Sequence, residues 1–207
     1  MRKGLLITNG NNLEPPLARP DAYGDRLDVA QLYDLEAGGR IFDALAPYAA
    51  LLLPIHADQL FLQRHRADID AYLDRGGTLV VNGHVAHPFA RELTRYVPVE
   101  NARMPDYEMV MLAAHPVFAG VDAHDLTFRR GVSGFYGRGS NPPPPGALAL
   151  TALRTSGAII DWVHERPEGG RIFMHSGNSI WMYQDEPDTS AARIVPQLID
   201  WVLGGEL

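Results

Sequence analysis

The sequence predicts an α/β fold built around a mostly parallel sheet, and two observations support this. First, three short apolar runs are continuous rather than alternating; they span residues 5–8, 49–55 and 78–81. Strands that are apolar on both faces are typical of parallel sheets covered by helices. Second, a stretch with helical spacing joins the second run to the third. This connection predicts a right-handed crossover between parallel neighbours.

The connecting helix has recognisable start and stop signals. Asp58 can cap its N-terminus, and Gly76 with Gly77 ends it before the next strand. The apolar face expected between these signals consists of Phe61, His65, Ile69, Tyr72 and Leu73. A short helix around residues 89–96 is expected to follow the third strand.

The second half of the chain is less regular and predicts an antiparallel excursion from the sheet. The expected strands are residues 108–112, 147–153, 158–164 and 170–175. Segments 13–25 and 130–146 are rich in Pro and Gly and are expected to be long loops. The last helix has an apolar face, and Pro196 predicts that it starts late or kinks. We expect residues 1–207 to form a single domain.

Composition excludes several classes of function. The net charge is −7 and the 18 Lys and Arg residues are scattered, whereas a nucleic-acid surface needs a basic patch. No run approaches ~18 apolar residues, and the N-terminal run is too short for a signal peptide. The chain has no cysteine, which excludes disulfides, thiolate metal sites and thiol nucleophiles. We therefore expect a cytoplasmic protein that contacts neither nucleic acid nor membrane.

Four short segments occur in an informative order. In the first, strand 49–55 leads into His-Ala-Asp; in the second, residues 72–83 predict a helix, a double glycine, a strand and a turn. The third, residues 115–121, has the sequence His-Pro-Val-Phe-Ala-Gly-Val, and the fourth is strand 170–175, which ends in His175. This set resembles the class I glutamine amidotransferase-like superfamily, especially divergent branches such as the trehalose-utilisation ThuA-like proteins. The resemblance implies a flavodoxin-like three-layer sandwich with His175 near the position of the catalytic histidine.

The chain departs from active members of that superfamily at two places. Their nucleophile is a cysteine in the turn after the central strand, where this chain reads Asn82-Gly83-His84. Active members also follow the histidine with Pro-Glu, whereas Ser176 follows His175 here. Two members of the triad are thus missing by motif, and we expect no glutaminase activity.

Ligands of open parallel sheets bind at the carboxyl ends of the strands. Polar residues follow four of the predicted strands, so the topology should gather them at one edge. The residues expected to bind a ligand are Asn9, Asn11, His56, Asp58, Asn82, Gly83, Ser176, Asn178 and Trp181. His175 and His84 are the candidate catalytic residues, because imidazole titrates near neutral pH.

Each of these candidates also has a plainer interpretation. His175 could be a strand-end histidine bonded to a neighbouring carbonyl. His84 and His87 could be metal ligands with His175 or Asp58, but Pro88 and the spacing favour turn histidines that bond backbone groups. Trp181 belongs to an aromatic group that suits either a sugar platform or core packing. If run 180–183 were exposed, it would indicate a homodimer interface.

Three functions remain open from the sequence. One is a pseudoenzyme that binds a small polar molecule, carbohydrate among the candidates, without a cofactor. Another is a divergent enzyme of hydrolase or isomerase type that uses His175 as acid or base. The third is a metal-dependent hydrolase built on His84 and His87. The sequence does not decide whether the protein is an enzyme.

Overall fold

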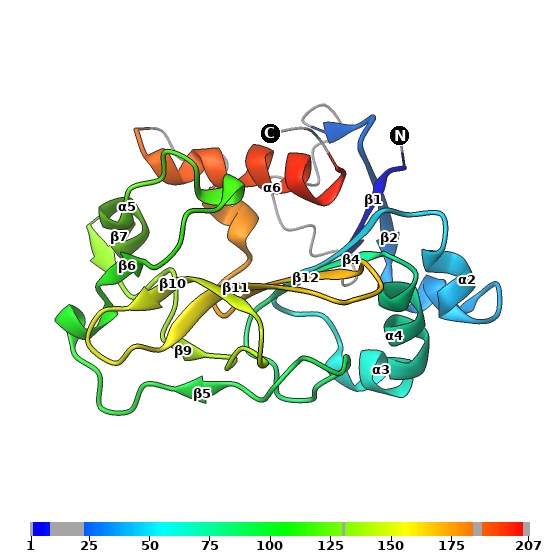
Figure 1. Cartoon of the computed structure of the whole chain (residues 1–207), viewed down its shortest axis with the longest axis horizontal. Helices are drawn as coiled ribbons and strands as arrows, with labels where there is room; N and C mark the ends of the chain where they lie inside the picture. The colour runs from blue at the N-terminus through cyan, green and yellow to red at the C-terminus, as the bar shows by residue number, and fades with distance from the viewer. Residues whose placement is uncertain (1, 9–22, 130, 184–187, 205–207) are drawn as a thin grey trace.

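The computed structural model describes residues 2–8, 23–129, 131–183 and 188–204 (Figure 1). Its centre is a mixed α/β arrangement around an eight-stranded, mostly parallel sheet with strand order β2-β1-β3-β4-β12-β11-β10-β6. The strands are β1 (Gly4–Thr8), β2 (Leu27–Gln31), β3 (Ala50–Leu53), β4 (Thr78–Asn82), β6 (Met109–Met111), β10 (Leu148–Leu153), β11 (Ile159–Glu165) and β12 (Arg171–His175).

The sheet has two halves that differ in strand direction. Neighbours from β2 through β1, β3 and β4 to β12 are all parallel. From β12 onward, β11, β10 and β6 alternate in direction. The α/β class and the antiparallel excursion predicted from the sequence are both confirmed. The edge strand β2 was not predicted from the sequence, because its five residues include Asp28 and Gln31 and lack a continuous apolar run.

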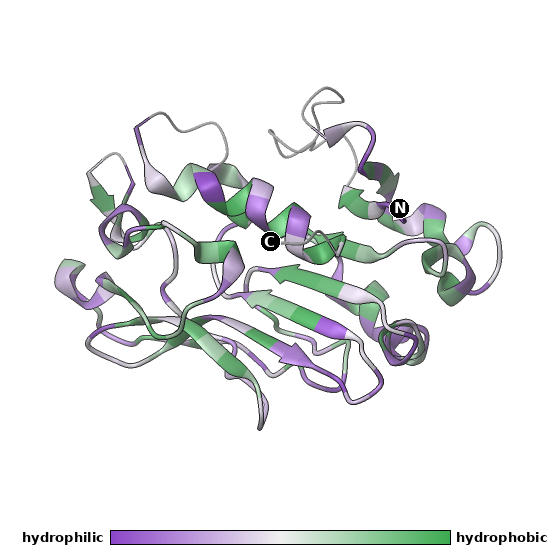
Figure 2. Ribbon diagram, turned by 45° about the horizontal axis from the view of Figure 1, so that its top comes forward, coloured by the Kyte–Doolittle hydropathy of each residue, from purple (hydrophilic) through white to green (hydrophobic). Residues whose placement is uncertain are grey.

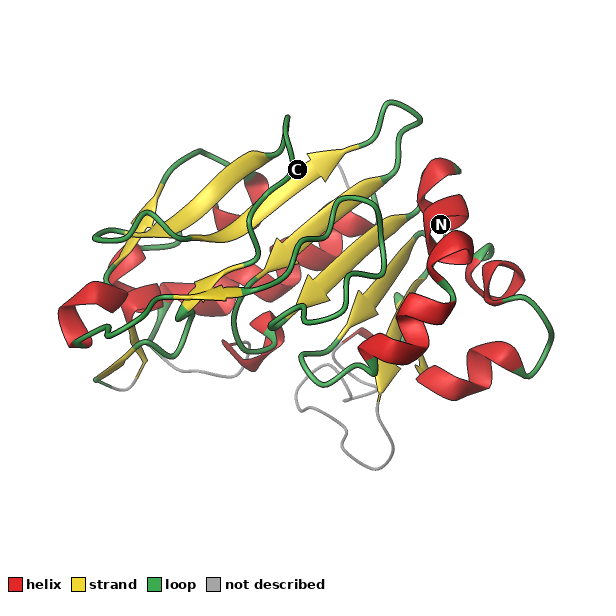
Figure 3. Cartoon of the chain, turned by 90° about the horizontal axis from the view of Figure 1, so that it is seen from below, coloured by secondary structure: helices red, strands yellow, loops and turns green. Residues whose placement is uncertain are grey.

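Each face of the sheet carries its own apolar core, because side chains alternate along a strand. Leu51, Leu53, Leu79 and Val81 pack on one face with α2 (Ile41–Leu45), α3 (Gln59–Arg64) and α4 (Arg66–Asp74). Leu52, Val80 and Phe173 pack on the other with α6 (Ile194–Val202). Figure 2 shows hydrophobic colour predominating along the strands, and Figure 3 shows helices on both sides of the sheet.

One short element, the 3-10 turn η1 (Leu32–Glu36), follows β2 and packs beside α2 in the parallel half. The other short elements are α5 (Ala123–Thr127), the pairs β5 (Val97–Pro98) with β9 (Gly139–Ser140) and β7 (Phe128–Arg129) with β8 (Val132–Ser133), and the 3-10 turns η2 (Met104–Tyr107), η3 (Pro116–Phe118), η4 (Ile180–Tyr183) and η5 (Ser190–Arg193). Within the described ranges, no helix is long and apolar enough to cross a membrane.

The predicted helix between residues 58 and 76 exists but breaks in the middle. His65 leaves helical geometry and separates α3 from α4, while its imidazole Nε2 lies 2.5 Å from the Glu36 carboxylate. Asp58 caps α3 as expected, accepting hydrogen bonds from the amides of Leu60 and Phe61. The predicted apolar face is buried at Phe61 and Ile69.

The helix predicted around residues 89–96 does not form. Phe89 and Leu93 are buried, so the apolar spacing is used for packing, but the backbone follows turns. Side chains take the place of helical bonds at this position. The Arg91 amide donates to Asp70, and the Thr94 hydroxyl donates to the Pro142 carbonyl at 2.6 Å. These tertiary bonds replace a local helix.

The last helix begins at Ile194, directly after η5, and Pro196 stands in its first turn. A proline is tolerated there, because the first amides of a helix lack intrahelical partners. The helix already includes Ile194 and Val195, so the late start predicted from Pro196 is not seen. Most of the predicted loop at 13–25 lies outside the described residues. The described part of the predicted loop 130–146, residues 131–146, is largely irregular and includes β8 and β9.

A buried arginine ties the β11–β12 turn to α4. The Arg166 side chain is 1% exposed and its guanidinium lies 2.6–2.7 Å from oxygens of Asp70, Asp74 and Glu92. The planar guanidinium suits this arrangement, since it presents several donors in fixed directions. The turn is thereby held by charge-assisted bonds as well as by apolar packing.

Candidate functional site

A fully buried histidine–aspartate pair lies at the carboxyl end of β12. His175 is the last residue of β12, and Asp161 stands opposite it on β11. The His175 Nδ1 and Asp161 Oδ1 atoms are 2.7 Å apart, and neither side chain is exposed. Burial of an ionisable pair requires that each group be paired and hydrogen-bonded.

The second carboxylate oxygen of Asp161 is also occupied. The Tyr136 hydroxyl donates to Oδ2 at 2.8 Å, and the Thr151 hydroxyl donates to the same atom. Burial, together with the negative charge of Asp161, raises the pKa of Tyr136 well above its ordinary value. Tyr136 therefore stays protonated and acts as a donor. An irregularity in the β10–β11 register at Thr151 places its hydroxyl beside Asp161.

These contacts decide which nitrogen of His175 faces Asp161. Asp161 accepts from both hydroxyls at Oδ2 and pairs through Oδ1 with the His175 Nδ1, which leaves Nε2 as the ring nitrogen that Asp161 does not contact. Nε2 is buried and has no hydrogen-bond partner among the described residues. The backbone at Gly177 covers it, because a Cβ placed there would lie 2.7 Å from Nε2.

The turn after β4 is the elbow at which the resemblance would place a nucleophile. Gly83 occupies it with a φ of 94°, a conformation that side-chain-bearing residues rarely adopt. A Cβ at this position would lie 2.5 Å from Ile55 Cγ1 and 3.1 Å from Ile55 Cα. The Gly83 amide donates to the His175 carbonyl at 2.9 Å, which joins the elbow to the end of β12.

Asn141 connects the elbow to the antiparallel half. Its side-chain amide donates to the Gly83 carbonyl and the Ser176 hydroxyl, and its side-chain oxygen accepts from the Val85 amide. Its own carbonyl accepts from the Trp162 indole at 2.8 Å. Asn141 is completely buried, so these bonds satisfy groups that have no access to water.

Several residues predicted to bind a ligand instead hold the strand ends together. Asn82 donates to the Leu53 carbonyl and accepts from the Ile180 amide, and it is buried. Ser176 is buried and accepts from Asn141, while the Asn178 amide donates to the Phe135 carbonyl at 3.1 Å. The structure does gather these residues at one edge, but their polar atoms contact the protein itself.

Other predicted site residues have different positions. Asp58 caps α3 and also accepts from the Tyr33 hydroxyl. Trp181 is fully buried, so its ring presents no exposed face to a ligand, in agreement with the core-packing alternative. Run 180–183 forms η4 and is mostly buried, which removes the basis for a homodimer interface there. Asn9 and Asn11 lie outside the described residues.

Accessible groups surround the elbow on its outer side. His84 is exposed at its edge and stacks on Tyr96 with ring centroids 3.7 Å apart. Burial of the inner part of the ring, and then the charge of nearby His175, lowers the pKa of His84. Gln59 fixes this loop, accepting from the amides of Ala86 and His87 and donating to the His84 carbonyl.

A metal site at His84 and His87, the less favoured alternative from the sequence, would need a third ligand such as His175 or Asp58. Across the described ranges, no three His, Asp or Glu side chains are arranged to hold a metal ion. The His84 ring is engaged by Tyr96, and the His87 amide is bonded to Gln59. This geometry gives the metal-dependent hydrolase no support.

Asp161, the carboxylate that orients His175, was not among the residues predicted from the sequence. The carboxylate is missing by motif, since Ser176 follows His175, but Asp161 reaches the imidazole from the neighbouring strand. A signal was present: Asp161 interrupts the apolar run Ile-Ile-Asp-Trp-Val, and a charged residue on a buried strand needs a partner. Asn141 was likewise not among the predicted site residues.

Comparison with known proteins identifies the fold but no family. The mmIFT52 N-terminal domain is similar with a TM-score of 0.57 and 13% sequence identity, over 98% of this chain and 98% of that chain. Similarity at this identity establishes a shared fold alone. No protein-family model matches the sequence, and a search of curated proteins gives no match.

Proposed function

We propose that this chain is a divergent class I glutamine amidotransferase-like protein without glutaminase activity, which binds a small polar ligand at the carboxyl ends of the strands. The proposal includes a flavodoxin-like three-layer arrangement and a carbohydrate as the foremost ligand class. The main support for the absence of glutaminase activity is Gly83. The elbow holds a residue without a side chain, and Ile55 fills the space that a nucleophile would need.

The buried groups behind the elbow support a binding role over catalysis. Asn82, Asn141 and Ser176 are already paired with protein atoms, so they stabilise the edge instead of contacting substrate. A satisfied network of this kind is rigid. The side chains that contact the ligand are then those on the outer side of the elbow, above all His84 and its stacked partner Tyr96. An aromatic pair beside a polar edge suits the apolar face and hydroxyls of a sugar.

Thermal-shift and calorimetric titrations with glucose, trehalose and L-glutamine test this proposal, together with an assay for glutamine hydrolysis. We expect saturable binding of a sugar, at least tenfold weaker in His84→Ala, and no release of ammonia from glutamine. His124→Ala is the matched control, because His124 is an exposed histidine that the proposed site does not use. Measurable glutamine hydrolysis by the wild type would contradict the proposal.

A second candidate, an enzyme that uses His175 as a general base, is favoured by one observation. Asp161 orients the imidazole so that Nε2 has no partner among the described residues, which is the arrangement of a histidine base held by a carboxylate. For this role, a substrate must displace the Gly177 turn that covers Nε2.

The two candidates separate in a His175→Gln variant. Gln keeps a polar group in the buried site, so folding can be checked by circular dichroism before activity is measured. Loss of turnover with unchanged sugar binding would support the enzyme. A wild type that binds sugar but shows no turnover on the glycosides and esters of a hydrolase screen would support the binding protein.

A further inference from the structure

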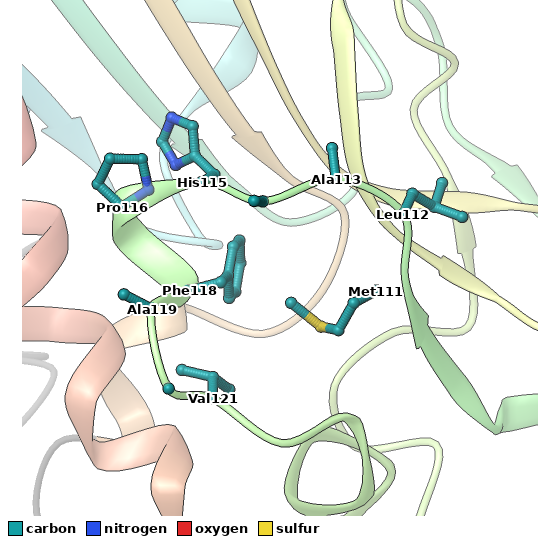
Figure 4. A pocket seen from close by; sticks show the side chains of 10 residues that line it. Met111, Leu112, Ala113, His115, Pro116, Phe118, Ala119 and Val121 are labelled. Carbon is teal, nitrogen blue, oxygen red and sulfur yellow. The ribbon is translucent and has the colours of Figure 1, made fainter.

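A cavity of about 630 Å³ lies beside β6, the edge strand farthest from β2. One continuous stretch from Met111 to Val121 surrounds it, leaving β6, forming η3 and returning toward α5 (Figure 4). The side chains of Met111 and Phe118 point toward each other across it. Its size lies within the range of pockets that bind small ligands or side chains.

Hydrogen bonds between β6 and β10 determine which backbone groups face this cavity. The Leu112 amide donates to the Leu150 carbonyl, and the Arg154 amide donates to the Glu108 carbonyl, both at 2.8 Å. Even-numbered residues of this segment therefore bond to β10, and odd-numbered residues point away from it. Met109 confirms the pattern, because its amide leaves the sheet and donates to the Thr127 hydroxyl at 2.9 Å.

Met111 is the next residue whose N–H and C=O point away from β10. No protein group bonds to either of them anywhere in the part of the chain that the structure describes. α5 covers the strand edge at Met109, but beside Met111 the cavity takes the place of a neighbouring strand. A donor and an acceptor side by side on a strand edge are the template for adding one more extended segment.

The cavity and its rim add chemical selectivity. No acidic side chain is among the residues that line the cavity, within the described ranges. Arg193 of η5 lies across Gly120, with its Cδ 3.7 Å from the position that a Cβ would occupy there. Arg193 is exposed and takes part in no ion pair within the described segments. A carboxylate placed near Gly120 would meet the Arg193 guanidinium.

We infer that this edge is a docking site for an extended peptide segment of a partner protein. The segment pairs with the Met111 N–H and C=O as an added strand, inserts one apolar side chain between Met111 and Phe118, and places a carboxylate against Arg193. The row formed by Met111, Thr151, Asp161 and His175 crosses adjacent strands, so the docking site lies two strands away from Asp161 and three from His175.

An array of acetylated pentapeptides tests the inference on the full chain. Each peptide has Leu at its centre and either Asp or Asn at one of the other positions, and binding is measured by fluorescence polarisation. The best Asp peptide should bind about three- to fivefold more tightly than its Asn partner, as expected for one exposed ion pair. Arg193→Gln should abolish that difference, whereas Arg95→Gln, an exposed arginine in the loop that carries Tyr96, should retain it.

Two further measurements separate strand addition from simple filling of an apolar pocket. Replacing the central peptide bond of the probe by an ester removes one donor and should weaken binding about fivefold, the contribution of one hydrogen bond. Ala119→Trp, a change at an exposed residue that lines the cavity, should abolish binding without unfolding the protein. Equal affinity of ester and amide probes, retained binding by Ala119→Trp, or no peptide that binds below millimolar concentration would overturn the inference.

Discussion

The two halves of the sheet are held together by different interactions. In the parallel half, β1, β3 and β4 are buried on both faces and carry almost only aliphatic side chains. In the antiparallel half, β10 and β11 place Thr151 and Asp161 in the interior, where Tyr136 and His175 complete a polar network. One half therefore depends on shape and volume, the other on the pairing of specific polar atoms.

This difference predicts a different response to substitution. An apolar core loses free energy in proportion to the atoms removed and tolerates exchanges of similar volume. A buried polar network does not, because removing one member leaves its partners without bonds in a dry interior. The experiments below test that contrast, beginning with the largest expected effect.

Asp161→Ala should cause the greatest loss of stability. It leaves the His175 Nδ1–H and the hydroxyls of Tyr136 and Thr151 without their acceptor, and breaking a buried pair in this way costs about 3–5 kcal/mol. Urea unfolding monitored by tryptophan fluorescence measures the free energy of unfolding. Asp161→Asn is the matched control and should lose clearly less, since its side-chain oxygen still accepts one bond.

Gly83→Ala should destabilise by about 3 kcal/mol, from an unfavourable backbone conformation together with overpacking against Ile55. Gly76→Ala provides the control, because Gly76 has a similar φ of 86° but nothing lies within 4 Å of the added carbon. The Gly76 variant reports the backbone cost alone. Equal losses in the two variants would mean that Ile55 does not restrict the elbow.

Asn141→Ala should cost about 2–3 kcal/mol, because the Val85 amide and the Gly83 carbonyl then lack their buried partner. Asn141→Asp keeps the acceptor for Val85 but removes the donor to Gly83 and Ser176. Backbone amide exchange by NMR distinguishes the two, and only the alanine variant should expose the Val85 amide. Protection of that amide in Asn141→Ala would show that another group bonds it.

Leu52→Met in the parallel half should change the free energy of unfolding by less than about 1.5 kcal/mol, since the two side chains have similar volumes. The same urea titration provides the comparison with Asp161→Asn, which is also a change of similar volume. If Leu52→Met proved as destabilising as Asp161→Ala, the contrast between the halves would fail.

The smallest effect concerns pH. Burial lowers the pKa of His84, aided by the charge of His175, and burial lowers the pKa of His115, aided by Arg171. Both sites bind protons less readily in the folded chain than in the unfolded chain. Stability should therefore be constant above the unfolded value of about 6.5 and should fall as the pH decreases below it. His84→Gln and His115→Gln should each flatten the decline in Tm between pH 7 and pH 5.

The contrast between the halves also explains what could be predicted from the sequence. Strands β3, β4 and β12 were predicted because a short continuous apolar run is a local pattern. The elbow was located for the same reason, as the turn that follows such a run. Asp58 was assigned correctly as a cap, because its partners are only two and three residues away.

Contacts between distant residues carry no such local signal. Asp161 and His175 are 14 residues apart, and Asn141 reaches Gly83 across 58 residues. The strand register brings Asp161 and His175 together, and an irregularity at Thr151 alters the neighbouring register locally, whereas the Asn141 contact joins two loops. The helix predicted at 89–96 failed for a related reason, since Asp70 and Pro142 provide tertiary partners that propensity does not include.

The contact between Ile55 and Gly83 also bears on how the protein can evolve. A single base change converts some glycine codons into cysteine codons, so the distance in sequence from this elbow to a thiol nucleophile is short. The structure makes that step costly, because the new Cβ would lie 2.5 Å from the Ile55 side chain and 3.1 Å from its Cα. Position 55 would have to change first, and that change has no benefit by itself. Together, Ile55 and Gly83 therefore restrict a lineage that carries both residues to functions that need no nucleophile at the elbow.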